Sequence, residues 1–219
     1  MKLLIDMGNS RLKWAVWQDA KLITGSALLN EHIDLALLFS SWQSLTPTQV
    51  LLSCVSANQL LDTVKSAVHE LWSVDVTEAR SVAEGFGVKN AYAKPETLGV
   101  DRWLALIAAR SLYDGALCVV DCGTAITIDL LAADGEHLGG FISAGIGLMK
   151  QALVRGTSAL PLVNSQHDVQ VANSTQAAIH SGTVLAVVGL IEKVLAGENK
   201  NFQLVLTGGD AELIAPLLN

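Results

Sequence analysis

The stretch LLIDMGNSRLKW, residues 3–14, decides how the chain is organised. An apolar run ends in Asp6, a glycine and two small polar residues follow, and a second strand-like run begins at residue 12. This pattern predicts a β-hairpin with a carboxylate at its bend. Taken alone, the acid and the glycine are equally compatible with ordinary turn chemistry.

The same pattern returns in the second half of the chain as CVVDCGTAITID, residues 118–129. Each half of the chain begins with one such hairpin, and the two hairpins can face one cleft and bind a polyphosphate between them. Glycine lets backbone N–H groups approach phosphate oxygens, and an aspartate at a strand end can hold a metal ion that neutralises the phosphates. The alternative is two unrelated hairpins, and their recurrence together with the segment 99–102 argues against it.

The composition of the 219 residues excludes several classes of protein. Hydrophobic residues make up 51%, which indicates a sizeable core and extensive apolar burial that can include a subunit interface. The net charge of −7 argues against a nucleic-acid partner, because binding a phosphate backbone needs a basic face. An anionic small substrate would therefore need locally placed cations.

The cysteines and the apolar segments predict a cytoplasmic protein. The three cysteines show no C-x-x-C spacing and lie in apolar runs, as reduced buried thiols do. An acid at position 6 comes too early for a signal-peptide core. The most apolar later stretch, 177–196, includes His180, Glu192 and Lys193, so we expect a buried helix and no membrane partner.

The periodicity of apolar residues predicts two halves of similar plan. The first half should hold three antiparallel strands through residue 29, a short helix, a strand at 48–53, a helix at 60–71, a short strand at 74–76 and a helix that begins at Thr97. From residue 117 the three-stranded plan repeats, followed by a helix through 153, an apolar helix after 173–175, a strand at 202–206 and a closing helix at 211–218. The predicted domains are residues 1–113 and 114–219.

Of the catalytic classes, phosphoryl transfer fits the residues best. The five histidines have no metal-site spacing, and G-x-S-x-G and G-x-x-x-x-G-K-[ST] motifs are absent. Phosphoryl transfer needs backbone donors, a metal ion and one base for the acceptor's proton, and Asp101 is the candidate base. Arg102 could clamp a substrate carboxylate. The alternative is a solvated charge pair at a helix start.

Three short motifs together resemble the signatures of type III pantothenate kinases. They are DMGNSRLK at 6–13, GVDR at 99–102 and DCGTA at 121–125, in that order. Smaller matches at 92–95, 139–140, 160–161, 173–175 and 207–209 extend the resemblance along nearly the whole chain. The resemblance implies an α/β fold with two ribonuclease-H-like (actin-like ATPase) lobes, each a mixed sheet flanked by helices. It also implies a homodimer.

The activity implied by this resemblance is phosphorylation of pantothenate by ATP to 4′-phosphopantothenate, the first step toward coenzyme A. Asp101 would be the proton acceptor, and Asp121 would hold a monovalent cation, K⁺ or NH₄⁺. Asp6 would lie near the Mg²⁺ that accompanies ATP. The implied ATP-binding residues are Asp6, Met7, Gly8, Asn9, Ser10, Arg11, Leu12, Lys13 and Thr124. The implied pantothenate-binding residues are Tyr92, Gly99, Val100, Asp101, Arg102 and Thr175.

Two departures from the family pattern and two other functions remain open. Ser10 stands where threonine is usual, and Ser143-Ala144-Gly145 replaces a loop with proline before the glycine. The chain could be another small-molecule kinase of the same fold, acting on a sugar or short acid. It could also be a nucleotide-binding regulatory protein, an accessory factor for transcription.

Overall fold

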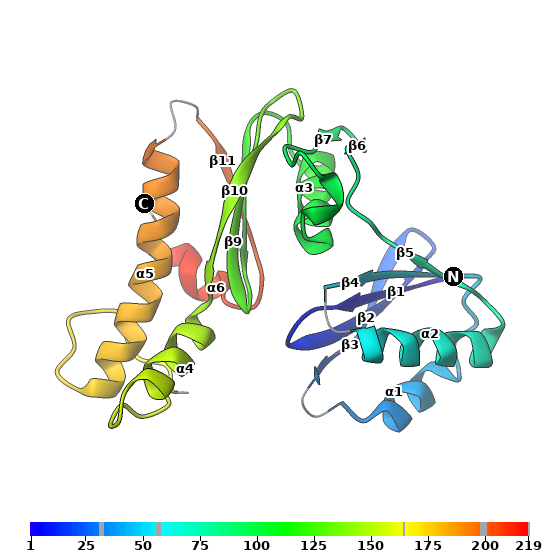
Figure 1. Cartoon of the computed structure of the whole chain (residues 1–219), viewed down its shortest axis with the longest axis horizontal. Coiled ribbons are helices and arrows are strands. Elements are labelled where there is room, and N and C mark those ends of the chain that lie inside the picture. Colours follow the sequence, from blue (N-terminus) through cyan, green and yellow to red (C-terminus); the bar gives the residue numbers. More distant parts are fainter. Residues whose placement is uncertain (31–32, 56–57, 164, 198–200, 219) are drawn as a thin grey trace. The chain divides into compact units, whose positions relative to one another are not determined.

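The computed structural model describes residues 1–30, 33–55, 58–163, 165–197 and 201–218. By its internal contacts the chain forms two compact units (Figure 1). The first unit comprises Met1–Val82 and Glu96–Leu104, and the second comprises Ala83–Pro95 and Ala105–Asn219. Each unit thus consists of two separate segments of the chain, so this grouping does not correspond to a single cut. The domain boundary between residues 113 and 114 stays a prediction.

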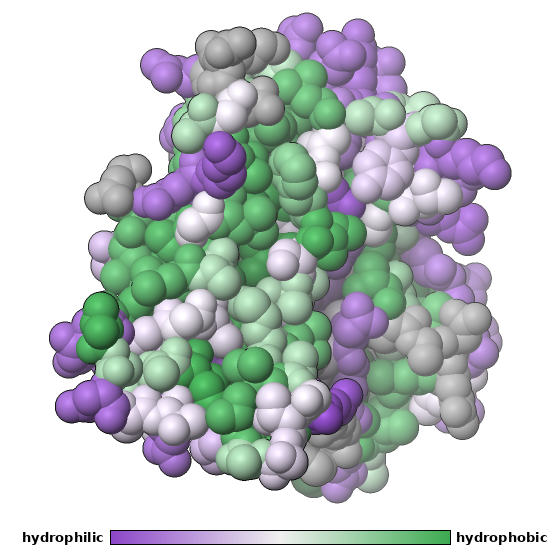
Figure 2. Space-filling model, turned by 60° about the vertical axis from the view of Figure 1, so that its left-hand side comes forward, coloured by the Kyte–Doolittle hydropathy of each residue, from purple (hydrophilic) through white to green (hydrophobic). Residues whose placement is uncertain are grey.

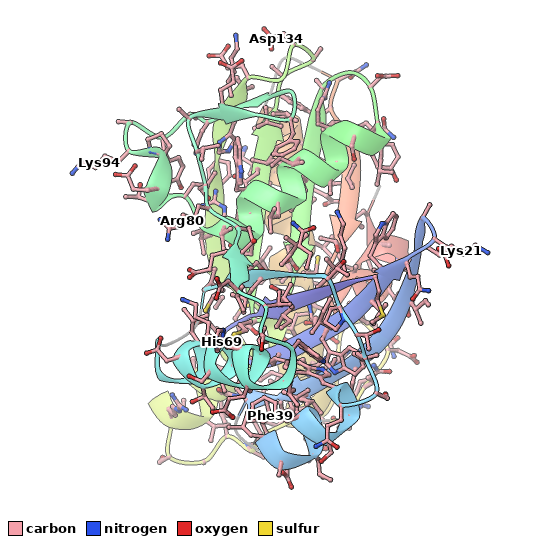
Figure 3. The ribbon with its side chains drawn as sticks, turned by 90° about the vertical axis from the view of Figure 1, so that its right-hand side faces the viewer. Lys21, Phe39, His69, Arg80, Lys94 and Asp134 are labelled. Atoms are coloured by element: carbon pink, nitrogen blue, oxygen red, sulfur yellow. The ribbon has the colours of Figure 1, made fainter. Side chains whose placement is uncertain are left out.

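The first unit contains a mixed five-stranded sheet of order β3-β2-β1-β4-β5. Strands β1 (Lys2–Met7), β2 (Arg11–Gln18) and β3 (Lys21–Leu29) form the predicted antiparallel meander. Strands β4 (Gln49–Cys54) and β5 (Val76–Glu78) extend the sheet in parallel on the other side of β1. Lys21 marks the outward-pointing β2–β3 turn in Figure 3.

Helix α1 (Leu35–Trp42) connects β3 to β4, and helix α2 (Asn58–Trp72) connects β4 to its parallel neighbour β5. Both helices lie on the same face of this sheet (Figures 1 and 3). Odd-numbered residues of β1 point to that face, because side chains alternate along a strand. The core around Trp42, which is fully buried, includes Leu3, Ile5, Met7, Leu12, Val50, Leu52, Val64 and Val68. Even-numbered Asp6 therefore projects from the opposite face.

The second unit repeats this plan in a four-stranded sheet of order β10-β9-β8-β11. Strands β8 (Leu117–Cys122), β9 (Ala125–Leu131) and β10 (His137–Ala144) are antiparallel, and β11 (Gln203–Thr207) adds in parallel beside β8. The two-stranded β6 (Glu84–Gly85) and β7 (Val88–Lys89) also belong to this unit. The α/β class with mixed sheets and flanking helices, predicted from the sequence, is confirmed.

The long helix α5 (Thr175–Gly197) packs its buried valines and isoleucines into the core of the second unit. Ser174 caps it, since its hydroxyl accepts the Ala177 N–H at 3.4 Å. By length and composition alone α5 could cross a membrane, but this is weak evidence because half of its apolar window is buried inside the protein. Helix α4 (Ile146–Gly156) contacts it.

Several predicted boundaries were wrong, among them three with a clear structural cause. Residues Pro95–Thr97 form a 3-10 turn, and helix α3 (Val100–Leu112) begins only after Gly99. The strand predicted at 74–76 is β5, because Ser73, with a φ of 54°, ends α2 and delays the strand. The closing helix divides into α6 (Ala211–Ile214) and a 3-10 turn, Ala215–Leu217, that contains Pro216.

Candidate active site

The first glycine turn lies between β1 and β2, where register pairs Asp6 with Lys13. The Lys13 ammonium is 3.9 Å from Oδ2 of Asp6, and both side chains are about half exposed. The Gly8 N–H donates to the Arg11 carbonyl at 3.0 Å and closes the turn. An accessible carboxylate and an accessible cation thus flank a tight turn, as a metal–polyphosphate ligand requires.

Two of the predicted ATP-binding residues in this turn, Met7 and Leu12, are fully buried. Their side chains pack into the core of the first unit. Only their main chain can face a ligand, because alternation along the strands sends their side chains to the opposite face from Asp6 and Lys13. Asn9 and Arg11 are exposed, and Gly8 and Ser10 are half-buried.

The predicted catalytic segment, Gly99 to Arg102, lies at the start of helix α3 and belongs to the first unit, whereas α3 from Ala105 on belongs to the second. Asp101 is exposed, and its Oδ1 accepts the Arg102 N–H at 2.8 Å. Arg102 is only 5% exposed. The alternative of a solvated charge pair is therefore wrong for Arg102, because a buried guanidinium cannot be a solvated cap.

The second glycine turn lies between β8 and β9 in the second unit, and Asp121 stands near the carboxyl end of β8. Gly208 has a φ of 95°, and a Cβ there would lie 2.4 Å from Oδ1 of Asp121. The Gly145 N–H donates to the Thr124 carbonyl at 3.0 Å, and a Cβ on Gly145 would lie 2.3 Å from the Gly123 carbonyl oxygen. Three backbone segments therefore meet closely beside this acid, which explains the glycine at position 145.

Tyr92 lies in the second unit, after β7. Its ring stacks on His137, with an interplanar angle of 13° and a centroid separation of 6.2 Å. Nε2 of His137 lies 2.8 Å from Oδ1 of Asp129, and both residues are buried. The Ala91 N–H points at Nδ1 of His137 at 3.5 Å. Sequence reasoning missed this pair, although an acid inside the apolar strand ITIDLL was its signal.

Thr175, the first residue of α5, lines a groove of about 760 Å³ between α4 and α5. The groove is mostly apolar and also includes Met149, Ala152, Leu153, Leu160, Ala178, Ile179, Gly182 and Thr183. Figure 2 shows the face on which α4 and α5 lie as largely hydrophobic. The large exposed side chains Leu148, Leu153 and Leu185 contribute to the apolar surface of these helices.

A buried imidazole near this groove is paired with a lysine. His180 is 1% exposed, and its Nδ1 lies 3.2 Å from Nζ of Lys150. Burial, with the charges of Lys150 and His167, lowers the pKa of His180 below 6.5. Burial also lowers the pKa of Lys150, against the attraction of Asp210. His180 therefore stays neutral at physiological pH.

Within the described part of the chain, no cluster of three or more histidines, cysteines or acids could hold a metal ion. A divalent ion bound at Asp6 would therefore need further oxygen ligands from a bound substrate such as a polyphosphate. Magnesium is commonly held in this way, by one or two carboxylates together with substrate phosphates. The single accessible carboxylate of Asp6 fits that arrangement.

The predicted site residues divide between the two units. Asp6 to Lys13 and Gly99 to Arg102 belong to the first unit, and Tyr92, Asp121, Thr124 and Thr175 to the second. The structure brings Asp6 and Lys13 together, and Gly99 and Asp101 together. Sequence reasoning missed two residues that contact the first glycine turn, Asn30 and Ser53.

The repeated mixed sheets with glycine turns at their strand ends define a fold of the actin-like ATPase class. A solved structure described as a 2-dehydro-3-deoxygalactonokinase from Sinorhizobium meliloti superposes with a TM-score of 0.61 at 13% identity, covering 100% of this chain and 92% of that one. A structure described as a Baf family transcriptional activator from Campylobacter jejuni gives 0.61 at 23% identity, covering 99% and 88%.

Sequence comparison narrows this class to one family. Residues 2–197 match the model of the type III pantothenate kinases. Curated type III pantothenate kinases from Nitrosococcus oceani and Chromobacterium violaceum are 37% and 39% identical, each over 100% of this chain and 86% and 91% of their own length. The chain belongs to the type III pantothenate kinase family, and it is a kinase that uses ATP.

Proposed function

We propose that this kinase transfers the γ-phosphoryl group of ATP to the 4′-hydroxyl of pantothenate. The products are 4′-phosphopantothenate and ADP, and the reaction is the first step of coenzyme A biosynthesis. The observation that carries the proposal is the family match over residues 2–197, which contains all three ordered motifs.

The turn of residues 6–13 would bind the ATP phosphates, with Lys13 beside the polyphosphate and Asp6 toward the metal ion. Bound Mg²⁺ supplies neutralisation of the phosphate charge. Support comes from the accessible Asp6 carboxylate, the exposed Lys13 and the tight Gly8 turn. Met7 and Leu12 would contribute main-chain atoms only, because their side chains are buried.

Asp101 would accept the proton of the pantothenate hydroxyl. At the same time the hydroxyl oxygen would form its bond to the γ-phosphorus, and the bond between the γ-phosphorus and ADP would break. The exposure of Asp101 at the first turn of α3 supports this role, since a base must reach the hydroxyl. Gly99, Val100 and Arg102 would bind pantothenate from the same segment, and Tyr92 and Thr175 are the further proposed contacts.

Asp121 would hold the monovalent cation, K⁺ or NH₄⁺, and Thr124 would contact ATP. Asp121 offers a carboxylate at a strand end, and Gly123 and Gly208, which have no side chain, leave the space beside its Oδ1 open. Oxygen ligands of this kind suit hard cations. Thr124 is exposed in the adjoining turn.

We also propose that the kinase is a cytoplasmic homodimer whose partner covers the apolar face of α4 and α5. Exposed Leu148, Leu153 and Leu185, together with the apolar groove, support this face as the interface. A patch of this kind is uncommon on a monomer's surface. Sedimentation of the parent and of Leu153→Glu tests it, and a parent that sediments as a monomer contradicts it.

The function is tested with purified protein, ATP and Mg²⁺, by following ADP release with and without pantothenate in K⁺ and then in Na⁺. Pantothenate-dependent ADP release and a phosphorylated pantothenate in the mass spectrum are expected, with higher activity in K⁺. Turnover of another hydroxylated acid instead of pantothenate would identify a different kinase. ATP binding without any phosphorylated product would indicate a regulatory protein.

A further inference from the structure

Two residues outside the glycine turn 6–13 contact it through hydrogen bonds, and neither belongs to a recognised motif. Ser53 lies in β4, and Asn30 follows the end of β3. Ser53 contacts the side chain of Asp6, and Asn30 contacts the backbone of the turn. Both belong to the first unit, as the turn does.

Ser53 fixes one oxygen of the Asp6 carboxylate. Parallel register places Ser53 directly beside Asp6, and antiparallel register places Lys13 on its other side. These three residues form a row across β2, β1 and β4 on the face opposite the apolar core. The Ser53 hydroxyl donates to Oδ1 of Asp6 at 2.6 Å, the short distance typical of a charge-assisted bond.

The bond from Ser53 also decides which oxygen of Asp6 is presented to a ligand. Ser53 is 8% exposed, so little water competes for this hydrogen bond. With Oδ1 held by Ser53, the other oxygen, Oδ2, is the one on the side of Lys13, at 3.9 Å from Nζ. The Asp6 carboxylate is therefore held in one orientation before any ligand arrives.

Asn30 orients the peptide groups of the turn. Its side-chain Nδ2 donates to the carbonyl oxygens of Gly8 at 2.8 Å and Asn9 at 3.0 Å, and its backbone N–H donates to that of Ser10 at 2.9 Å. Three successive carbonyls thus point toward one residue. In a trans peptide the next N–H points opposite to the carbonyl, so the N–H groups of Asn9 and Ser10 face away from Asn30.

A turn with its carbonyls tied back and its N–H groups facing outward is suited to an anion, because successive N–H dipoles then point at the same place. We infer that Ser53 and Asn30 are positioning residues of the ATP-phosphate turn: Ser53 sets the Asp6 carboxylate and Asn30 sets the backbone donors. The inference rests on the proposed function, because it assigns the turn to the ATP phosphates. Neither residue needs to touch the substrate.

The test measures steady-state kinetics of four variants with pantothenate and ATP varied separately. Ser53→Ala removes the hydroxyl, and Ser53→Thr keeps it. Asn30→Ala removes the carboxamide, and Asn30→Asp keeps its shape but replaces the donor with an oxygen. The matched control is Thr48→Ala. The Thr48 hydroxyl donates to the Met1 carbonyl at 3.2 Å, where β1 and β4 begin, at the other end of the strand pair from Asp6 and Ser53.

Loss of a hydrogen bond that orients a charged or ligand-binding group should raise the KM for ATP by about tenfold in Ser53→Ala, Asn30→Ala and Asn30→Asp. Ser53→Ala should in addition raise the Mg²⁺ concentration needed for half-maximal rate. The KM for pantothenate should stay within about twofold of the parent value. Ser53→Thr and Thr48→Ala should behave as the parent does.

Thermal unfolding of each variant separates positioning from support of the fold. Lower thermal stability with an unchanged KM for ATP and an unchanged Mg²⁺ requirement would overturn the inference, because support of the strands alone predicts that result. A parent protein that releases no ADP in response to pantothenate would instead overturn the proposed function. In that case the Kd for ATP, measured by calorimetry, still tests the two residues. It should be raised in Ser53→Ala, Asn30→Ala and Asn30→Asp and unchanged in Ser53→Thr and Thr48→Ala.

Discussion

Asp101 and Arg102 are neighbours on the first turn of α3, yet Asp101 is exposed and Arg102 is buried. Oδ1 of Asp101 accepts the N–H of Arg102 at 2.8 Å, so the carboxylate satisfies one of the free N–H groups at the helix start while it remains open to solvent. The same residue is thus anchored and accessible, as a proton acceptor must be.

Asp101→Asn should keep the fold and lower kcat by about 10²- to 10⁴-fold, because an amide keeps the shape and the hydrogen-bond acceptor but cannot take a proton. Rates of ADP release at saturating ATP and pantothenate measure it. Asp62→Asn, an exposed aspartate in α2, is the control and should retain full activity. A near-parental rate in Asp101→Asn would remove this residue from the mechanism.

Gly99→Ala should lower kcat by about 10- to 100-fold, because its Cβ would lie 2.5 Å from Oδ1 of Asp101 and displace the carboxylate. The matched control is Gly147→Ala in α4, where no atom lies within 4 Å of the added methyl group. Parallel kinetics and unfolding curves measure both. Equal activity of the two variants would show that the carboxylate tolerates the shift.

His137→Phe should destabilise the protein by about 2 kcal/mol, because the ring loses a hydrogen bond to the buried carboxylate of Asp129. The phenyl ring can still contact Tyr92 but is no longer oriented by Asp129, so the KM for pantothenate, which Tyr92 is proposed to bind, should rise as well. Urea unfolding and substrate kinetics provide the two measurements. His69→Gln, on an exposed part of α2 (Figure 3), should change neither.

The stability of the protein should fall as the pH drops below about 6.5, and His180→Gln should reduce this dependence. Burial, Lys150 and His167 depress the pKa of folded His180, so the unfolded chain binds the proton first. The contribution of His180 is present above 6.5 and is lost as the pH falls toward the folded-state pKa. Unfolding midpoints from pH 8 to pH 5 measure it; parallel curves for parent and variant would contradict it.

Cys118 and Cys122 should resist iodoacetamide while the protein is folded. Burial, with a smaller contribution from Asp129, raises the pKa of Cys118 to about 12. Burial followed by the charges of Asp121 and Asp210 raises that of Cys122 to about 11. The thiolate is the reactive form, so alkylation at pH 8 should be slow until urea is added. Mass spectrometry of both states checks this; labelling of Cys122 in the native protein would contradict it.

Local sequence was sufficient to predict the two glycine turns, the repeated strand plan and the start of α5 within residues 173–175. These features depend on residues close together in the chain: alternation along strands, glycine at turns and a hydroxyl before a helix. The three ordered motifs also indicated the family, which the comparisons confirmed. Where α3 begins was predicted wrongly, because the 3-10 turn before it has the same local signals as a helix start.

Only the tertiary structure decided which neighbours surround these motifs. Ser53 and Asp6 are 47 positions apart, and their hydrogen bond depends on the pairing of β1 with β4. The burial of Arg102, Met7 and Leu12 depends on which face of an element meets the core. Strand register and packing join distant parts of the chain, so the spacing of residues in the sequence identifies an acid such as Asp6, whereas the fold selects the hydroxyl that orients it.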